Sequence, residues 1–335
     1  MSPKTPTEPS MLPLVAILGP TASGKSALAV SLAERLGGEV IACDSTQVYR
    51  GFDIGTAKPS AAERRDIPHH MIDLVSPAET FTAGEYRKRA LDVLADLRRR
   101  RRLPIFTVGT GLYFRALLEG LADAPTRSDQ ARARLNAIYS RNRGAARLHR
   151  VLSRLDPIAA QRISPNDRQK LVRALEVCLL AGKPLTELHQ AGRQGLEGYR
   201  PLKIGLNPPR QALYQRIEKR VRTMLDRGWS EEVDALAAQG APATAKPFEF
   251  IGYRELRAHA EAGQPLSGTV EAIAQATRHY AKRQLTWFRR ESGVQWLADF
   301  GDSPETLSAS LAYLEPLLES LNKAVQPPEA GDAYN

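Results

Sequence analysis

The chain has 335 residues, of which 42% are hydrophobic, so it is long enough to bury a sizeable core in one large domain or two modest ones. Its 47 Lys and Arg residues outnumber its 37 Asp and Glu residues, and the net charge of +10 favours polyanionic partners such as nucleic acid, although a merely solvated basic surface gives the same count. Because Cys43 and Cys178 stand alone and no apolar run approaches the roughly 20 residues that span a bilayer, we exclude a disulfide framework, a zinc site and a membrane protein, and expect a cytoplasmic protein.

The ends of the chain differ from its middle. Residues 1–12 and 324–335 are rich in Pro and small or polar residues and are predicted to be disordered. Between them, short apolar runs alternate with longer stretches of helical periodicity. This alternation predicts an α/β fold, with a mostly parallel sheet covered by helices on both faces. The runs predicted to be strands are 14–18, 40–43, 104–108 and 202–206.

The first predicted strand leads into a loop with the spacing G-x-x-x-x-G-K-[ST], and a helix is predicted to begin near Lys25. In such a loop, backbone N–H groups and the helix N-terminus converge on phosphate oxygens. Lys25 would neutralise phosphate charge, and the Ser26 hydroxyl would coordinate Mg²⁺. The pattern predicts a polyphosphate site of the kind used for ATP and other nucleotides, without deciding the reaction. The loop consists of Gly19, Pro20, Thr21, Ala22, Ser23, Gly24, Lys25 and Ser26.

Polar or glycine-rich segments also follow the next two predicted strands. Ligands of open α/β sheets bind at the carboxyl ends of the strands, so these segments are expected to meet at one site. Asp44 is a candidate general base or a partner of magnesium-bound water, and a structural turn is the plainer alternative. Thr110 would supply a hydroxyl beside it. The two segments are Asp44-Ser45-Thr46-Gln47 and Gly109-Thr110-Gly111.

Residues 126–195 contain no strand-like run, and arginine-rich amphipathic stretches follow one another there. We interpret this region as a helical insertion that divides a core domain of residues 13–125 and 196–300. The predicted helices of the insertion are 128–141, 145–154 and 167–180, and those after it are 210–227, 231–239 and 270–290. A short run at 294–297 is a candidate last strand.

For three further groups of residues, a structural role or simple exposure to solvent competes with a role in binding or catalysis. The arginines at 98–102 are predicted to form a solvated helix end. His69 and His70 are expected to be structural rather than catalytic. In the predicted helix 270–290, basic and aromatic residues alternate, which suits either a solvated face or RNA binding.

Seven segments, in their order and spacing, resemble the tRNA dimethylallyltransferases, also called tRNA isopentenyltransferases. They are GPTASGKS, DSTQVYRGFDIGTAKP, IPHHMIDL, GTGLYFRAL, QKLVRALEV, IGYREL and TRHYAKRQLTWFR. The resemblance covers about residues 13–297. It implies a P-loop NTPase-like core and an enzyme that moves a dimethylallyl group from dimethylallyl pyrophosphate to N6 of adenosine 37 in tRNA, with Mg²⁺ as cofactor.

The resemblance also implies roles for individual residues. Residues 19–26 and Arg220 would hold the pyrophosphate, with Mg²⁺ at Ser26. Asp44 and Thr110 would be catalytic, and residues 44–47 and Thr110 would meet the target adenosine. A monomeric enzyme is expected. Contacts with the anticodon stem-loop are implied for Arg132, Gln169, Lys170, Leu171, Val172 and Arg173.

Several positions depart from the family's usual pattern, and Arg168 and Lys170 are among them. Val108 stands where a glycine is usual in the loop after the third predicted strand. Glu249, within Phe248-Glu249-Phe250, stands where a basic residue is usual, so a basic contact there is lost or reversed.

The implied reaction and its rivals make different demands on the same residues. In prenyl transfer, Asp44 would accept a proton from N6, the phosphate loop would stabilise the leaving group, and the target base would be flipped out of its stack. A small-molecule kinase would instead use residues 126–195 as a lid. A non-catalytic RNA-binding module with a nucleotide-dependent switch is a third reading, and it predicts RNA binding without product.

Overall fold

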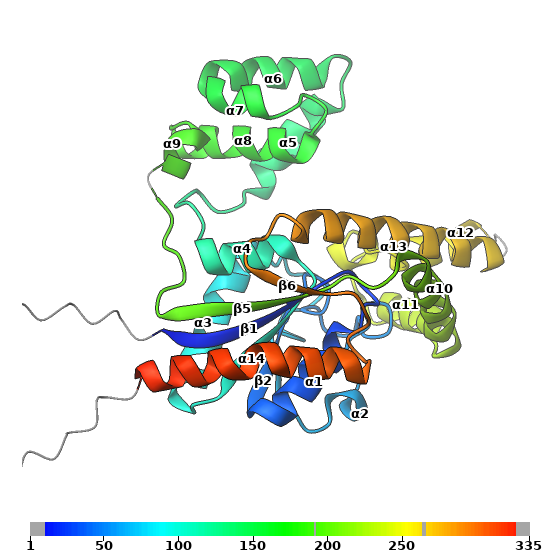
Figure 1. Ribbon diagram of the computed structural model, residues 1–335. Coiled ribbons are helices and arrows are strands. Elements are labelled where there is room, and N and C mark those ends of the chain that lie inside the picture. The colour runs from blue at the N-terminus through cyan, green and yellow to red at the C-terminus, as the bar shows by residue number, and fades with distance from the viewer. Residues whose placement is uncertain (1–10, 191, 263–265, 326–335) are drawn as a thin grey trace, which may run out of the picture. The chain divides into compact units, whose positions relative to one another are not determined.

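A computed structural model of the protein describes residues 11–190, 192–262 and 266–325 (Figure 1). The chain divides into two compact units. One, here called the sheet unit, contains the described residues up to Leu117 and from Glu197 onward, and the other, the helical unit, spans Leu118–Leu196. The sequence analysis placed the start of the insertion at 126, several residues after the point where the structure divides.

The sheet unit is built on six parallel strands in the order β3-β2-β4-β1-β5-β6. This confirms the predicted α/β fold with a parallel sheet. The central strand β1 is buried almost throughout, as expected of a strand covered on both faces. The strand bounds are β1 Leu12–Leu18, β2 Gly38–Cys43, β3 His69–His70, β4 Leu103–Val108, β5 Tyr199–Leu206 and β6 Val294–Leu297. Val108 ends β4, buried between neighbouring strands, so it belongs to the sheet and not to the loop that follows.

Helices cover both faces of this sheet (Figure 1). Val15, Ile17 and Ile105 point to one face, where α1 and α14 pack, while Phe106, on the opposite face, packs against Phe114 of α4. The helices of this unit are α1 Lys25–Leu36, α2 Ala61–Arg64, α3 Ala83–Arg99, α4 Gly111–Glu119, α10 Arg210–Asp226, α11 Trp229–Ala238, α12 Tyr253–Ala262, α13 Leu266–Phe288 and α14 Pro304–Val325, with a 3₁₀ turn at Lys246–Glu249. None of the helices in the described ranges is long and apolar enough to cross a membrane.

The last helix, α14, lies beyond the limit of 300 that the sequence analysis gave to the core. Its Leu314 and Leu321 are buried against β1, β5 and α1. The prediction of disorder is therefore wrong for the ends of the described chain, since Leu12 already belongs to β1 and α14 continues to Val325. Residues 1–10 and 326–335 lie outside the described residues.

The short edge strand β3 was not predicted, and its His70 shares the Glu39 carboxylate with two of the arginines at 98–102, Arg100 and Arg102. His70 Nε2 lies 2.7 Å from Glu39 Oε2, and Arg100 binds both oxygens of the same carboxylate. Glu39 is buried, and the hydrogen bond from Arg100 is the main reason why its pKa falls to about 2. The interpretation of 98–102 as a solvated helix end agrees with the structure, since α3 ends at Arg99 and residues 98–101 are exposed, and the ion pairs of Arg100 and Arg102 with Glu39 add a structural role to it. The structural role expected of His70 is also observed.

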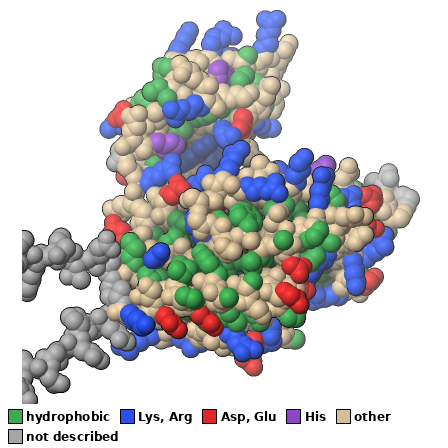
Figure 2. Space-filling view, viewed as in Figure 1, with side chains coloured by type: hydrophobic (Ala, Val, Ile, Leu, Met, Phe, Trp, Pro, Cys, Tyr) green, Lys and Arg blue, Asp and Glu red, His purple; other side chains and the backbone are tan. Residues whose placement is uncertain are grey.

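The helical unit contains five helices around its own small core. They are α5 Asp129–Tyr139, α6 Gly144–Leu155, α7 Pro157–Arg162, α8 Arg168–Ala181 and α9 Leu185–Gln190. Leu135, Leu148, Leu152 and Leu175 are among the residues that fill the core. Among charged side chains on the face seen in Figure 2, Lys and Arg predominate over this unit.

Replacing Leu314 with Ala tests whether α14 is part of the core. We expect Leu314→Ala to lower the free energy of unfolding of the sheet unit by about 2–5 kcal/mol, because the side chain is completely buried and its removal leaves a cavity. Urea unfolding followed by tryptophan fluorescence measures this, since Trp229, Trp287 and Trp296 all lie in the sheet unit. Glu319→Ala, at an exposed position of the same helix, is the control and should change stability by no more than about 0.5 kcal/mol.

Candidate active site

The carboxyl ends of β1, β2 and β4 meet at one edge of the sheet, because the three strands are parallel neighbours. An open cavity of about 1570 Å³ is lined by the segments that follow them. Residues 21–26 come from the loop after β1, residues 44–47 from the segment after β2, and Arg220 from α10. The structure therefore brings together candidates that lie almost 200 residues apart in the sequence.

The loop after β1, residues 19–26, has the backbone of a phosphate-binding loop. Ala22 and Gly24 adopt φ values of 64° and 89°, and alternation of left- and right-handed conformations turns successive N–H groups toward one point. A Cβ atom at position 24 would lie 2.7 Å from the backbone nitrogen of Gly301, so only glycine fits there. Lys25 Nζ donates hydrogen bonds to the carbonyl oxygens of Gly19 at 2.9 Å and Pro20 at 2.8 Å. The ammonium group thus bridges the loop at the position where phosphate oxygens would bind.

A buried amide from α13 connects this loop to the one after β4. Gln284 Oε1 accepts a hydrogen bond from the backbone N–H of Thr21 at 2.8 Å, and Gln284 Nε2 donates one to the carbonyl oxygen of Gly109 at 2.8 Å. Only 6% of Gln284 is exposed. Both loops are consequently held at a fixed distance by one side chain, whose role the sequence analysis did not recognise although it lies within TRHYAKRQLTWFR.

Two cations share the phosphate side of the cavity. Burial lowers the pKa of the Lys25 ammonium to about 8, the Asp44 carboxylate acts in the opposite direction, and the Arg220 guanidinium lowers it further. Burial also lowers the pKa of Arg220, which stays charged as arginines do. Neither cation has a carboxylate at ion-pair distance in the described part of the chain. The site is therefore electrostatically prepared for an anion that it does not itself supply.

The Asp44 carboxylate has one occupied and one available oxygen. Its Oδ1 accepts hydrogen bonds from the Thr46 backbone N–H at 2.8 Å and from the Thr46 hydroxyl at 2.6 Å. Its Oδ2 would lie 2.6 Å from a Cβ atom at Gly109, so a side chain there would displace the carboxylate. Thr110 Oγ1 accepts from the backbone N–H of Ser45 at 3.0 Å and donates to Ser45 Oγ at 3.2 Å. Thr110 thus holds the segment after Asp44, and Oδ2 has no hydrogen-bond partner among the described residues.

Several cavity residues gave no signal in the sequence analysis. Arg216 binds Asp302 through two hydrogen bonds of 2.7 and 2.9 Å, and Gly301 N–H donates to the Ser23 carbonyl oxygen, so the segment before α14 supports the phosphate loop. Lys58 is buried and pairs with Asp53 and Asp73. Pairings between residues so far apart leave no local pattern. Glu249, singled out as a departure from the family pattern, lines the cavity.

Some basic and aromatic residues of α13 make structural contacts, and others line the cavity. Arg278 pairs with Glu271 of the same helix, and Trp287 packs against Gly111, where a Cβ atom would lie 2.1 Å from the indole nitrogen. Tyr280 lines the cavity, and burial raises its pKa well above the usual range. The helix therefore supplies part of the cavity wall in addition to an exposed basic face.

In the helical unit, the two arginines expected to contact tRNA share one buried carboxylate. Arg132 Nη2 lies 2.9 Å and Arg173 Nη1 2.8 Å from Glu176 Oε2, and Glu176 is fully buried. Burial favours the protonated acid, but the hydrogen bonds from Arg132, Arg173 and the Ser128 N–H outweigh it, and the pKa of Glu176 is lowered. These arginines hold the unit together as well as carrying charge.

The prediction that residues 169–173 form a continuous contact segment is corrected in part. Leu171 and Val172 lie in the core of the helical unit, so their side chains do not reach a partner. Lys170 is exposed and pairs with Asp167, and Gln169 is exposed in the first turn of α8. Helical periodicity explains the difference, since residues three and four apart share a face of a helix, so a run of five residues spans both the buried and the exposed side.

The cavity offers oxygen atoms that could bind Mg²⁺. No group of three His, Cys, Asp or Glu side chains suited to a metal occurs among the described residues. Mg²⁺ commonly keeps several waters and binds through one or two protein oxygens together with substrate phosphates. Ser26, exposed at the start of α1, and Asp44 provide oxygen atoms of this kind beside the phosphate loop. The residues therefore fit a magnesium ion that arrives with a phosphate ligand.

Residues 47–291 match the family model described as IPP transferase. The chain is 51% identical over 294 residues to the tRNA dimethylallyltransferase of Solibacter usitatus, a match that covers 88% of this chain and 95% of the relative. It is 48% identical over 302 residues to the tRNA dimethylallyltransferase of Koribacter versatilis, covering 90% and 98%.

Two solved structures are similar over most of the chain. The tRNA isopentenylpyrophosphate transferase of Bacillus halodurans has 36% identity and a TM-score of 0.68, with 92% of this chain and 98% of that one covered. A eukaryotic dimethylallyltransferase described as acting on tRNA has 25% identity and a TM-score of 0.78, with 92% and 80% covered.

The lowered pKa of Lys25 predicts how phosphate binding depends on pH. Lys25 carries its charge below pH 8 and loses it as the pH rises through about 8, so the affinity for inorganic pyrophosphate should fall above that pH by up to tenfold per pH unit. Titration calorimetry between pH 6.5 and 9.5 measures this. Lys25→Arg keeps a charge throughout this range and is the matched control, because the ionisation of pyrophosphate itself affects both proteins equally. Parallel affinity curves for the two proteins would contradict the assignment.

Proposed function

The chain belongs to the IPP transferase family, and we propose that it transfers a dimethylallyl group from dimethylallyl pyrophosphate to N6 of adenosine 37 in tRNA and releases pyrophosphate. One observation carries the proposal. Asp44, a carboxylate with a free oxygen, lines the same cavity as two cations without carboxylate partners among the described residues, Lys25 of the phosphate loop and Arg220 of α10. The first suits a nucleophile that must lose a proton, and the second suits a leaving group that gains negative charge.

On the leaving-group side, the loop of residues 19–26 would bind the pyrophosphate through its N–H groups and the start of α1. As the bond between the allylic carbon and the phosphate oxygen breaks, negative charge grows on the pyrophosphate. Lys25 and Arg220 stabilise that charge, and their burial strengthens the effect because water screens it less. Mg²⁺, held by Ser26 and the pyrophosphate, would add positive charge at the same oxygens.

On the nucleophile side, the exocyclic amine of adenine is weak because its lone pair is delocalised into the ring. Asp44 Oδ2 would accept a proton from N6 as the new N–C bond forms, while Thr46 keeps Oδ1 in place. Thr110 contributes by holding Ser45, the residue that follows Asp44 in the sequence. A position for N6 between Asp44 and the phosphate loop satisfies both demands.

Binding of the tRNA would draw on the helical unit and on base flipping. The target base must leave its stack to reach the sheet edge, which costs a few kcal/mol. Basic side chains such as Lys170 and the outer faces of Arg132 and Arg173 would offset this cost by contacting phosphates of the anticodon stem-loop.

The direct test incubates the protein with unmodified tRNA, labelled dimethylallyl pyrophosphate and Mg²⁺, and follows label into the RNA. The proposal expects label on adenosine 37 and release of one pyrophosphate for each transfer. A small-molecule kinase would give ATP turnover without labelled RNA, and a non-catalytic module would bind tRNA without product. Either outcome would replace the proposed function.

Replacing Asp44 tests the proton-transfer step. Asp44→Asn keeps the shape and the hydrogen bonds to Thr46 but removes the base, so the single-turnover rate should fall by about 10²–10⁴-fold with both substrates still bound. If Asp44 acted only through magnesium-bound water, the variant would instead need more metal. Single-turnover rates across a magnesium series separate the two roles, and full recovery at high Mg²⁺ would end the general-base assignment.

A further inference from the structure

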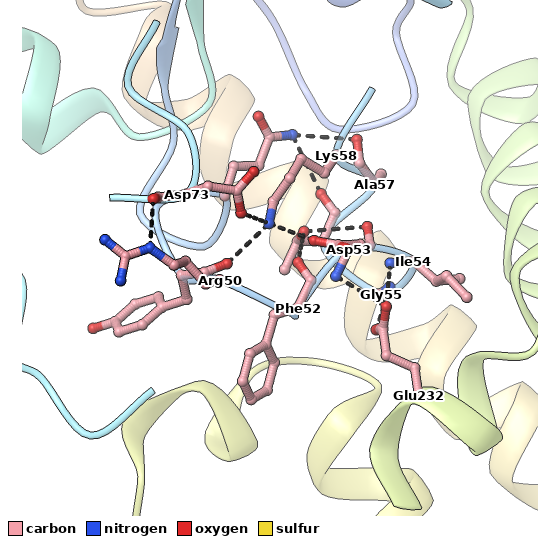
Figure 3. A network of polar contacts seen from close by, with 12 residues as sticks. Arg50, Phe52, Asp53, Ile54, Gly55, Ala57, Lys58, Asp73 and Glu232 are labelled. Carbon is pink, nitrogen blue, oxygen red and sulfur yellow. Dashed lines mark hydrogen bonds and ion pairs between the residues drawn. The ribbon is translucent and has the colours of Figure 1, made fainter. Parts of the chain in front are cut away.

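A side chain from α11 holds the irregular loop between β2 and α2 (Figure 3). Glu232 Oε2 accepts hydrogen bonds from the backbone N–H groups of Asp53 at 3.0 Å and Ile54 at 2.7 Å. Glu232 Oε1 accepts from the N–H of Gly55 at 3.4 Å. Three successive N–H groups thus converge on one carboxylate, in the arrangement by which loops elsewhere bind anions.

The packing around this contact leaves no room for a ligand. The Tyr253 hydroxyl donates a further hydrogen bond to Glu232 Oε1 at 2.5 Å, so both oxygens are fully used. A Cβ atom at Gly55 would lie 2.1 Å from the indole nitrogen of Trp229 and 2.5 Å from a ring carbon of Tyr253. Glu232 therefore fixes the backbone of the loop.

The next residues of the loop determine how Gln47 is oriented. Gln47 Nε2 donates hydrogen bonds to the carbonyl oxygens of Thr56 at 3.3 Å and Ala57 at 3.2 Å. Carbonyl oxygens only accept, so the amide nitrogen must face them and the opposite orientation would bring three oxygens together. Gln47 Oε1 has no hydrogen-bond partner among the described residues, and Gln47 lines the cavity three residues after Asp44.

A buried cation anchors the other end of the loop. Lys58 Nζ donates to the Tyr49 carbonyl oxygen at 2.9 Å and pairs with Asp53 and Asp73. The loop is thus held on both sides of Thr56 and Ala57, by Glu232 before them and by Lys58 after them.

We propose that Glu232 is a positioning residue for the target adenosine: by fixing residues 53–57 it makes Gln47 present its amide oxygen to the amine of the base. This rests on the proposed function and adds a requirement to it. The N6 amine has two hydrogens. Asp44 takes one as the N–C bond forms and the C–O bond to pyrophosphate breaks, and the second stays on N6 in a hydrogen bond to Gln47 Oε1.

The arrangement selects an amine over a carbonyl group at this position of the base. An acceptor held in place attracts N–H donors and repels an oxygen, which is what guanine and hypoxanthine carry at the equivalent position. A Gln47 side chain free to rotate would lose that selectivity.

The experiment compares Glu232→Ala with Glu231→Ala, whose side chain is exposed next to it on α11. Single-turnover prenylation is measured with saturating substrates, together with the KM for dimethylallyl pyrophosphate. We expect Glu232→Ala to lower the rate about 10–100-fold and to leave that KM unchanged, with Glu231→Ala like the wild type. Added formate or acetate should restore part of the rate, because a small anion can accept hydrogen bonds from the three N–H groups that lose the Glu232 carboxylate.

The outcomes separate the inference from the proposed function. If the wild type forms no product, the proposed function fails. If the wild type is active and Glu232→Ala is equally active, or is slowed without rescue and with an equal loss of dimethylallyl pyrophosphate binding, Glu232 is not a positioning residue for the adenosine.

If Glu232→Ala does not fold, a double-mutant cycle of Glu232→Gln and Gln47→Met tests the same inference. Glu232→Gln retains the size of the side chain and weakens the contact with the loop. If Glu232 acts through Gln47, Glu232→Gln lowers the single-turnover rate when Gln47 is present but has little further effect on the rate of Gln47→Met. Independent effects, adding in free energy, would overturn the inference.

Discussion

The geometry of the site depends on the two hydrogen bonds made by the buried amide of Gln284. Gln284 binds both the phosphate loop, at Thr21, and the loop after β4, at Gly109. Gly109 in turn lies against Asp44, so the distance from phosphate to carboxylate is set through Gln284. Displacement reactions need the nucleophile, the reacting carbon and the leaving group in line, and small errors in that distance are costly. A rigid connection through the sheet and α13 suits this demand better than contacts among loops.

The charges of the cavity complement the geometry. Lys25 and Arg220 are half-buried without carboxylate partners at ion-pair distance in the described chain, which costs folding free energy. A pyrophosphate group would relieve this cost, and the relief grows as charge accumulates on the leaving group. The protein thus keeps its strongest unmet interaction for the part of the reaction where charge changes most.

Local patterns predicted what local physics determines. The apolar runs gave five of the six strands, and G-x-x-x-x-G-K-[ST] gave the phosphate loop, because both depend on neighbouring residues. Gln284, Glu232 and the pair of Arg216 with Asp302 could not be found this way, since each acts on backbone or side chains far away in the chain. Leu171 and Val172 show the opposite error, in which a segment was assigned as a whole although one face of its helix packs into the core.

Three carboxylates show how the surroundings of one chemical group determine its role. Glu176 is fully buried and bound by Arg132, Arg173 and the Ser128 N–H, and it holds the helical unit together. Glu232 receives three N–H groups and a phenol, and it holds a loop. From the residues that the structure describes, Asp44 receives hydrogen bonds on one oxygen only. A carboxylate whose lone pairs are all used has lost the capacity to accept a proton, whereas one that is half used is both fixed and reactive. The count of donors around each oxygen therefore distinguishes the proposed base from the supports, and it does so without reference to any other protein.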